Sequence, residues 1–320
     1  MPILITGASG FVGRHLVNHL LQTNPDLDIH GTTLPDMPYK EQPGVTFHGV
    51  DLKNAAKVDE LISNVRPSAI YHLAAQAFVP RSFEEPWETL ENNILSQLNV
   101  IQACLKKNVA PRMLVISSSD IYGPVTPQEL PITENAQLKP TNPYSVSKIA
   151  QDMMAFQYYL SHKLPIMRAR SFNHFGPGQN ENFVAPAFAM QIARIETGLQ
   201  QPEIKVGDLS AKRDFTDVRD IVRAYRFIVE KGQPGDVYNV CSGEVYSAQQ
   251  LLDTFLGSCD ISIEVTVDPQ RLRPVTIPIV QGDNSRLNAA TGWQPQISFE
   301  QTLADVLEDC RHRVRSDASK

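Results

Sequence analysis

Cysteine is scarce in this sequence, and its four copies are far apart: Cys104, Cys241, Cys259 and Cys310. None of them forms a Cys-x-x-Cys pair, which argues against a zinc ribbon and against a redox dithiol motif. The spacing also gives no disulfide framework of the kind that small secreted domains need. We therefore expect reduced thiols in the core or on the surface, and a cytoplasmic protein.

Long apolar runs and clusters of positive charge are also missing. No apolar stretch approaches the ~20 residues that a membrane-spanning helix requires. The N-terminus runs directly into a predicted strand without a basic segment, so we expect no signal peptide. The net charge is −6 and no polybasic run is present, which disfavours a nucleic-acid surface. The expected partners therefore include neither a membrane nor a nucleic acid.

What the sequence does contain is a regular alternation of short apolar runs and amphipathic segments. Its 320 residues, 42% of them hydrophobic, allow about two domains of ~150 residues each. In the first half we predict strands at 3–5, 29–33, 45–50, 69–73 and 113–117, and helices at 11–22, 56–64 and 88–107. This alternation predicts an α/β fold, a Rossmann-type doubly wound parallel sheet with helices on both faces.

The second half is less regular. We predict helices at 142–160, 183–197, 217–231 and 299–313, and strands at 166–171 and 237–240. The strand at 237–240 is expected to return to the first sheet, so the second domain is interleaved with the first. We therefore assign 1–172 plus 214–242 to a dinucleotide-binding domain, and 173–213 plus 243–320 to a smaller substrate-binding domain.

A glycine-rich turn, Gly7 to Gly13, joins the first predicted strand to the first helix. Gly7 permits the tight turn, Gly10 lets the backbone approach a pyrophosphate, and Gly13 allows close packing of helix and sheet. The spacing is G-x-x-G-x-x-G, which differs from the general dinucleotide fingerprint. Its place after the first strand nevertheless favours a dinucleotide site over a merely structural turn.

The choice between NAD and NADP stays open. An NAD site usually has an acidic residue at the end of the second strand, but Asp36 comes several residues late. No arginine stands there for a 2′-phosphate either, and Arg14 and Lys40 are the candidate substitutes. After the third strand, Asp51-Leu52 suits a contact with the adenine edge, although Asp51 fits a simple helix cap equally well.

Tyr144 and Lys148 form the strongest candidate for chemistry. Four residues apart on a helix, they lie on one face, one turn from each other. We expect the ammonium to lower the pKa of the tyrosine from its usual ~10, which makes a general acid/base for interconverting an alcohol and a ketone. Ser118 ends a predicted strand and is placed to donate to the same substrate oxygen. The alternative for this serine cluster is a turn rich in side chain–backbone bonds.

Together, the glycine turn, the strand end Leu73-Ala-Ala75, the Ser118 loop and the Tyr144/Lys148 pair resemble the extended short-chain dehydrogenase/reductases. The segments 170–179, 212–220, 271–274 and 291–293 resemble the GDP-mannose branch of that family. Within this branch, 213–221 is most similar to GDP-6-deoxy-4-ketohexulose reductases, which make GDP-rhamnose. The resemblance covers essentially the whole chain.

The resemblance implies roles for particular residues. Ser118, Tyr144 and Lys148 match the catalytic triad, and Asp120 stands where dehydratases of the family carry a glutamate base. The implied cofactor residues, besides Tyr144 and Lys148, are Gly7, Gly10, Phe11, Val12, Gly13, Thr32, Asp51, Leu52, Leu73, Ala74, Ala75 and Ser117. The implied substrate residues are Asn173, Phe183, Val184, Lys205, Gly207, Arg213 and Arg273. We expect no metal site, because His174 has no ligand-spaced partner.

The expected reaction is NAD(P)H-dependent reduction of the 4-keto group of a GDP-4-keto-6-deoxy sugar. A GDP-mannose 4,6-dehydratase or a nucleotide-sugar 4-epimerase on the same scaffold is the alternative, and a non-catalytic dinucleotide-sensing module is a remote one. Asp120 is one methylene shorter than the glutamate of the dehydratases, a shift that disfavours dehydration. The loop 32–44 also lacks the arginines with which the dehydratases build a tetramer. We therefore expect a homodimer that pairs helices 88–107 and 145–160 with their mates, the alternative being a monomer.

Overall fold

The computed structural model describes residues 1–269 and 277–318 and is built around one parallel sheet. The seven strands follow the order β10-β6-β5-β4-β1-β2-β3. Every neighbouring pair is parallel, as expected for a doubly wound fold. The strands are β1 (Ile3–Thr6), β2 (Ile29–Thr33), β3 (Val45–Gly49), β4 (Ala69–His72), β5 (Arg112–Ser118), β6 (Ile166–Ser171) and β10 (Val237–Val240).

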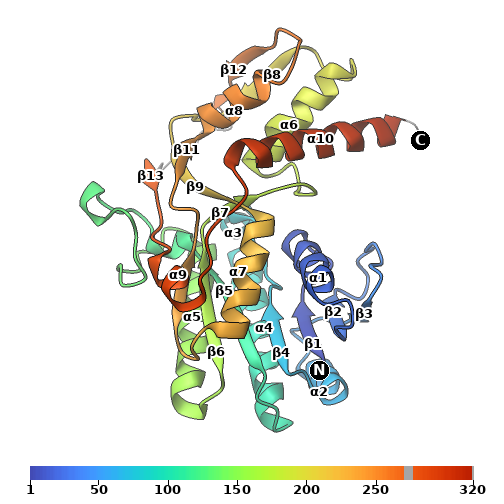
Figure 1. The fold of residues 1–320 in the computed structure, drawn as a ribbon, viewed down its shortest axis with the longest axis vertical. Helices are drawn as coiled ribbons and strands as arrows, with labels where there is room; N and C mark the ends of the chain where they lie inside the picture. Colours follow the sequence, from blue (N-terminus) through green and yellow to red (C-terminus); the bar gives the residue numbers. More distant parts are fainter. Residues whose placement is uncertain (270–276, 319–320) are drawn as a thin grey trace.

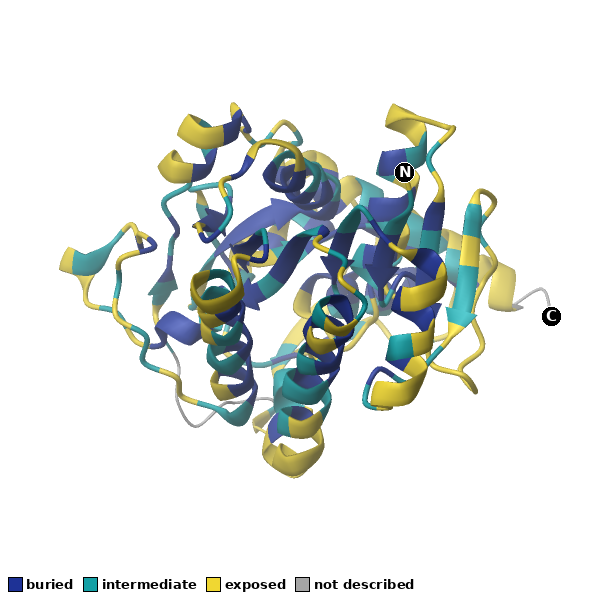
Figure 2. Ribbon diagram, turned by 90° about the horizontal axis from the view of Figure 1, so that it is seen from below, coloured by how far each residue is buried: buried dark blue, intermediate teal, exposed yellow. Residues whose placement is uncertain are grey.

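Helices cover both faces of this sheet (Figure 1). One face packs against α2 (Ala55–Val65), α4 (Pro86–Lys106) and α5 (Pro143–His162). The other packs against α1 (Phe11–Thr23), α7 (Val218–Lys231) and α9 (Ser285–Thr291). Figure 2 shows the strands buried between helices whose outer sides are exposed. The predicted Rossmann-type sheet is confirmed.

A second, smaller core lies beyond the carboxyl ends of the strands, at the top of Figure 1. Its helices are α6 (Val184–Glu196), α8 (Ala248–Leu256) and α10 (Phe299–Ala318). A two-stranded sheet pairs β8 (Glu203–Val206) with β12 (Glu264–Val267). A further small sheet surrounds β9 (Lys212–Asp217), which pairs with β7 (Asn173–Phe175), β11 (Val245–Ser247) and β13 (Ile279–Val280). The sequence pattern predicted none of these short strands.

The proposed division into two interleaved domains stays a prediction, and two elements lie across its boundaries. Strand β9 belongs throughout its length to the small sheet, although the division splits it at 213/214. Leu287 of α9 and Trp293 pack into the core around the large sheet, although the division assigns both to the substrate domain. Of the helices in the described residues, none is long and apolar enough to cross a membrane.

The N-terminus of α5 is defined by local sequence. The Asn142 side chain accepts a hydrogen bond from the Ser145 N–H at 2.7 Å, and Pro143 occupies the first turn, where its missing N–H costs nothing. The helix therefore begins immediately before Tyr144. Tyr144 lies on the side of the first turn that faces the sheet and is buried there. Lys148 follows on the same side one turn later and is also buried.

A buried ion cluster fixes α5 against β6. The Asp152 carboxylate on α5 accepts from Arg168 at 2.8 Å and from Arg170 at 2.9 Å, and its side chain is fully shielded from water. Arg170 also donates to the Tyr122 hydroxyl and the Glu134 carbonyl, so its charge is well satisfied. Since the cluster sits two turns beyond Tyr144, it holds the helix that carries the Tyr144/Lys148 pair.

Replacing Asp152 with alanine is expected to lower the free energy of unfolding by about 3–5 kcal/mol, because two buried guanidinium groups lose their carboxylate. Urea unfolding measures the change. Glu88→Ala is the matched control, since it removes one carboxylate from an exposed pair with Arg81 and should change stability little. Equal stability of Asp152→Ala and the wild type would contradict a holding role for the cluster.

Candidate active site

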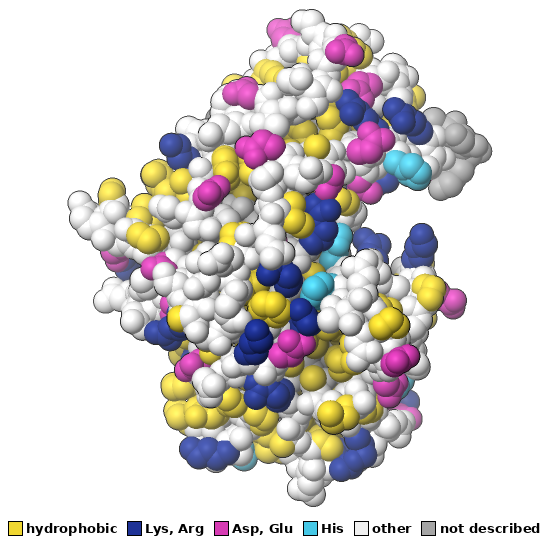
Figure 3. Space-filling model, viewed as in Figure 1, with side chains coloured by type: hydrophobic (Ala, Val, Ile, Leu, Met, Phe, Trp, Pro, Cys, Tyr) yellow, Lys and Arg dark blue, Asp and Glu magenta, His cyan; other side chains and the backbone are white. Residues whose placement is uncertain are grey.

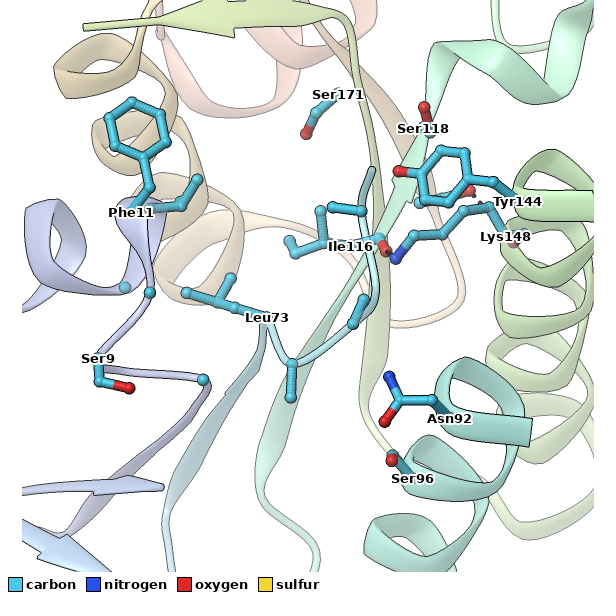
Figure 4. A pocket seen from close by; sticks show the side chains of 18 of the residues that line it. Ser9, Phe11, Leu73, Asn92, Ser96, Ile116, Ser118, Tyr144, Lys148 and Ser171 are labelled. Carbon is cyan, nitrogen blue, oxygen red and sulfur yellow. Dashed lines mark hydrogen bonds between the residues drawn. The ribbon is translucent and has the colours of Figure 1, made fainter. Parts of the chain in front are cut away.

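A cavity of about 540 Å³ opens along the carboxyl ends of β1, β2, β4, β5 and β6 (Figure 4). Ligands of doubly wound sheets bind at this edge, because strand order reverses there between β1 and β4. The sequence-predicted cofactor residues all line it: Gly7, Gly10, Phe11, Val12, Gly13, Thr32, Asp51, Leu52, Leu73, Ala74, Ala75, Ser117, Tyr144 and Lys148.

The glycine turn has the geometry that close backbone approach requires. Gly7 has a φ of +69°, which favours glycine, and its N–H donates to the Thr32 hydroxyl at 3.1 Å. A Cβ on Gly13 would lie 2.4 Å from the Gly7 carbonyl oxygen, so only glycine fits there. The first turn of α1 carries no acidic side chain, so nothing opposes an anion at this helix N-terminus. These features fit the pyrophosphate of a dinucleotide.

Hydroxyl groups, and no carboxylate, mark the end of β2 in this cavity. The Ser9 hydroxyl donates to the Thr33 hydroxyl at 3.1 Å, and both residues line the cavity. Arg14 and Lys40, our candidates for a 2′-phosphate contact, instead line a separate cavity behind the turn. Asp51 lines the main cavity while its carboxylate accepts from the Lys53 N–H at 2.9 Å, so it also caps a turn.

Ser118, Tyr144 and Lys148 gather at the other end of the cavity (Figure 4). Tyr144 and Lys148 come from α5, and Ser118 comes from the end of β5. The Lys148 ammonium donates to the Ile116 carbonyl at 2.9 Å and lies 5.9 Å from the centre of the Tyr144 ring. Asp120 lines the same end, and its N–H donates to the Ser118 hydroxyl oxygen at 3.2 Å.

Burial dominates the protonation of this pair. It raises the pKa of Tyr144, as does the negative charge of Asp120, while a hydrogen bond with Ser118 acts in the opposite direction. Burial also lowers the pKa of Lys148 to about 7. Our expectation that the ammonium lowers the pKa of Tyr144 is not met in this structure, because burial and the charge of Asp120 raise it. Tyr144 stays protonated at neutral pH and can donate a proton.

The predicted substrate residues divide into two groups. Asn173 and Phe183 line the cavity. Val184, Lys205, Gly207 and Arg213 are not among the described residues that line it. Lys205 is exposed on the outlying strand β8, and the Arg213 guanidinium donates to the Lys212 and Ile277 carbonyls. Arg273 lies outside the described residues, so these assignments stay predictions.

Several polar side chains in the cavity escaped sequence reasoning. Asn92 and Ser96 reach it from α4, where their spacing of four residues was the available signal (Figure 4). Ser171 and Tyr225 also line it, with their hydroxyl oxygens 2.6 Å apart. Tyr225 comes from α7, which no local pattern connects with Tyr144. The structure alone reveals it.

His174 and Gln179, which we did not assign to the site, line the cavity next to Asn173. The ring of His174 stacks on Phe11 at 6.5 Å, and its Nδ1 bonds with the Phe172 carbonyl at 3.0 Å. Within residues 1–269 and 277–318, no three His, Cys, Asp or Glu side chains are grouped to hold a metal ion. His174 is thus part of the cavity wall.

The parallel sheet, the glycine turn and the Ser118/Tyr144/Lys148 group define a Rossmann-type enzyme of the dehydrogenase/reductase class. The family model described as GDP-mannose 4,6 dehydratase matches residues 4–306. The chain belongs to this family.

Curated relatives match along almost the whole of this chain. GDP-6-deoxy-D-mannose reductase from Pseudomonas aeruginosa is 37% identical over 315 residues, covering 98% of this chain and 99% of the relative. GDP-mannose 4,6 dehydratase from Drosophila melanogaster is 26% identical, covering 95% of this chain and 85% of the relative. Reductases and dehydratases are thus both among the similar proteins.

Solved structures match equally far. RMD from Pseudomonas aeruginosa complexed with NADPH has a TM-score of 0.87 and 36% identity, with 98% of this chain and 99% of that chain covered. UDP-glucose 4-epimerase from Thermus thermophilus complexed with NAD has a TM-score of 0.86 and 28% identity, with 97% and 99% covered. Both carry a nicotinamide dinucleotide.

The lowered pKa of Lys148 predicts a characteristic dependence of stability on pH. Unfolding lets Lys148 take up a proton at any pH below its ordinary pKa of 10.5, whereas the folded protein binds that proton only below about pH 7. Burial of Lys148 therefore lowers the free energy of unfolding by its full amount below about pH 7, and this loss disappears as the pH rises toward 10.5. Each unit of difference in pKa corresponds to about 1.4 kcal/mol. Relative to Lys148→Met, the wild type should therefore gain stability steadily between pH 7 and 10.

Urea unfolding of both proteins across this pH range measures the difference. Lys148→Met also loses the bond to the Ile116 carbonyl, which changes its free energy of unfolding by the same amount at every pH. The slope of the stability difference against pH is therefore the informative quantity. Lys107→Met, outside the cavity, is the control and should show no such slope. A pH-independent difference for Lys148→Met would contradict burial of the ammonium.

Proposed function

We propose that this protein is a reductase that uses NAD(P)H to reduce the 4-keto group of a GDP-4-keto-6-deoxy sugar. GDP-4-keto-6-deoxymannose is the favoured substrate, and a GDP-rhamnose-type sugar nucleotide is the product. One observation carries the proposal: Ser118, Tyr144 and Lys148 line one end of the same cavity whose lining also includes the Gly7–Gly13 turn, and the Lys148 amine lies 5.9 Å from the centre of the Tyr144 ring. The similarity to GDP-6-deoxy-D-mannose reductase along the whole chain supports it.

The cavity fits NAD(P)H along its length. The Gly7–Gly13 turn would hold the pyrophosphate, Asp51 and Leu52 would contact the adenine end, and Lys148 would hold the nicotinamide ribose. When bound, the reduced nicotinamide supplies the hydride for the ketone carbon. The protein's part is to bind, to orient and to manage the proton.

Tyr144 provides that proton. Its hydroxyl donates to the oxygen that gains negative charge as the ketone is reduced, and Ser118 hydrogen-bonds the same oxygen. The Lys148 cation then stabilises the tyrosinate that remains, within a cavity where low polarity strengthens the attraction.

The substrate residues complete the proposal. Asn173 and Phe183 are part of the cavity wall. We propose that Arg213 and Arg273 anchor the diphosphate, since a guanidinium fork suits a diphosphate better than an ammonium does. Val184, Lys205 and Gly207 are proposed to line the nucleoside beyond them. Binding energy remote from the ketone would then fix the reacting geometry.

Asp120 keeps dehydration as a second candidate. It lies beside Tyr144 closely enough to raise the pKa of that tyrosine, and the family model and several relatives are dehydratases. A dehydratase or an epimerase regenerates its dinucleotide, whereas a reductase consumes it. Consumption of the dinucleotide therefore separates the two.

Purified protein should oxidise NADPH or NADH in the presence of GDP-4-keto-6-deoxymannose, observed as loss of the reduced-nicotinamide absorbance. Tyr144→Phe is expected to lower kcat/KM by roughly 10²–10⁴-fold, because the proton donor is lost. Tyr158→Phe is the matched control on the same helix; its hydroxyl bonds with Gln102 outside the cavity. Formation of a 4-keto product from GDP-mannose without added reductant would instead establish a dehydratase.

We also propose a homodimer that pairs α4 and α5 with their mates. Along α5, Val146, Met153 and Leu160 are exposed by 45%, 39% and 52% and recur every seven residues, so they form one apolar stripe. A four-helix arrangement would cover it.

Light scattering after gel filtration should give twice the monomer mass of 35.6 kDa. Met153→Asp is expected to halve that mass, because it places a charge in the helix contact. Val267→Asp, on an exposed strand far from α5, is the control and should remain a dimer. A wild-type mass of one chain would exclude this arrangement.

We place the protein in the cytoplasm. All four cysteines are unpaired, and three of them are buried. Burial raises the pKa of Cys104, so this thiol is unreactive. Unpaired thiols are typical of a reducing compartment, which is also where reduced dinucleotides are available.

A further inference from the structure

The loop between β7 and α6, residues 176–180, is held by side chains from two distant helices. We call it the wall loop, because it continues from Asn173 and His174 on the cavity wall. Its central Gly178 has a φ of +83°, so the backbone turns sharply there. In loops of this kind, backbone N–H and C=O groups need partners from elsewhere, and here side chains supply them.

Two partners come from α1. The Arg14 guanidinium donates to the Gly178 carbonyl at 3.3 Å, and the His15 Nε2 bonds with the Pro177 carbonyl at 2.8 Å. Helix α1 begins at the glycine turn, so it presents its N-terminus to the cofactor site and its next turn to the wall loop. The α1 side of the loop is thereby tied to the large sheet.

Two further partners come from α10, which belongs to the smaller core. The Asp309 carboxylate accepts from the Gly178 N–H at 2.9 Å, and Arg313 donates to the Gln179 carbonyl at 3.1 Å. Asp309 and Arg313 also form an ion pair at 3.6 Å. Almost 300 residues separate the two sets of partners along the chain, yet they meet on three consecutive loop residues.

Gln179 connects the wall loop to the cavity. Its side chain is buried, lines the cavity, and donates to the His174 carbonyl at 3.2 Å. The carbonyl oxygen of the same side chain is buried without a hydrogen-bond partner in the structure. The position of His174, and of Asn173 before it, therefore depends on where the loop is held.

The helices α1 and α10 do not close on each other directly. A second cavity of about 680 Å³ separates them and is lined by Arg14, His15, Pro177, Gly178, Asp309 and Arg313, among others. Figure 3 shows this face of the molecule hollowed below α10, with Lys and Arg side chains on both rims. The wall loop is the bridge across this cleft.

We propose that Asp309 and Arg313 of α10 are positioning residues for the active site, which hold the wall loop against α1 and thereby place Asn173, His174 and Gln179. The proposal rests on the proposed function, since it assigns the 173–179 wall to the nucleotide sugar. Asp309 is not among the described residues that line the main cavity, and it is not one of the predicted cofactor or substrate residues. Its effect on catalysis passes through the loop backbone.

The ion pair between Asp309 and Arg313 is partly exposed, so it contributes little to stability. The side chains of Asp309 and Arg313 are exposed by 28% and 37%, and water screens such pairs effectively. The bond from the Gly178 N–H is different in kind, because it fixes a turn in the left-handed region. A shift of about 1 Å in a positioning group costs on the order of 100-fold in rate.

Asp309→Ala tests the proposal. We expect a higher KM for the 4-keto nucleotide sugar and a kcat/KM reduced on the order of 10-fold or more, with an unchanged Kd for NADPH, because the glycine turn keeps its own contacts. Amide hydrogen exchange within 173–180 should accelerate. Asp309→Asn should recover much of both, since its side-chain oxygen can still accept from the Gly178 N–H.

Glu308→Ala is the matched control: Glu308 is the next residue on α10, is exposed by 66% and pairs only weakly with Arg311. If Asp309→Ala matched this control in kinetics and in exchange, the positioning role would be overturned. If it lowered Tm but left the exchange of 173–180 and the sugar KM unchanged, the residue would be structural only, which also refutes the proposal. Should the wild type reduce no 4-keto sugar, the proposed function fails, while the exchange comparison still decides whether α10 holds the loop.

Discussion

The seating of one helix, α5, on strands β5 and β6 is the constraint on which the rest of the site depends. Two interactions fix it on the strands, the bond from Lys148 to the Ile116 carbonyl and the buried Asp152 cluster with Arg168 and Arg170, while the Asn142 cap sets where the helix begins. Each acts at a different height along the helix, so neither sliding nor rotation is free. Tyr144 faces the cavity as a consequence of this seating.

Burial then determines the chemistry. The same shielding that removes water from Tyr144 and Lys148 raises the pKa of the tyrosine and lowers the pKa of the lysine to about 7, so both the neutral and the cationic form of Lys148 are accessible near neutral pH. Asp120 adds to this effect through its charge. A pair in this condition is prepared to give a proton to an oxygen that becomes negative, which is the demand of ketone reduction.

Sequence alone predicted the large sheet, the flanking helices α1, α2, α4, α5 and α7 but not α9, and the residues at the two ends of the cavity. That success has a physical origin: alternation and glycine spacing are local properties, and strand ends of a parallel sheet necessarily share an edge. Tyr225, Asn92 and Ser96 were missed because periodicity identifies a buried face but not the neighbour that it meets. The pKa of Tyr144 was misjudged for a related reason, since sequence reports a nearby charge but not the loss of water. For Arg213 the limit is different. The sequence identifies the residue by its resemblance to the family, but it does not predict that the side chain donates to the Ile277 carbonyl.

The path of the chain through the large sheet has a consequence for folding order. Strand β10 is the last to join, and it pairs with β6 only after the chain has left the sheet to build β7, α6, β8 and β9. Until α7 docks, the face of the sheet that it shares with α1 exposes apolar residues such as Leu114 of β5 and Met167 of β6. On the ribosome, the first 200 residues therefore cannot complete a closed core, however native-like their strands are. The nascent chain passes through a stage with an uncovered sheet face and an open edge at β6, which is the stage most exposed to aggregation and most dependent on chaperones.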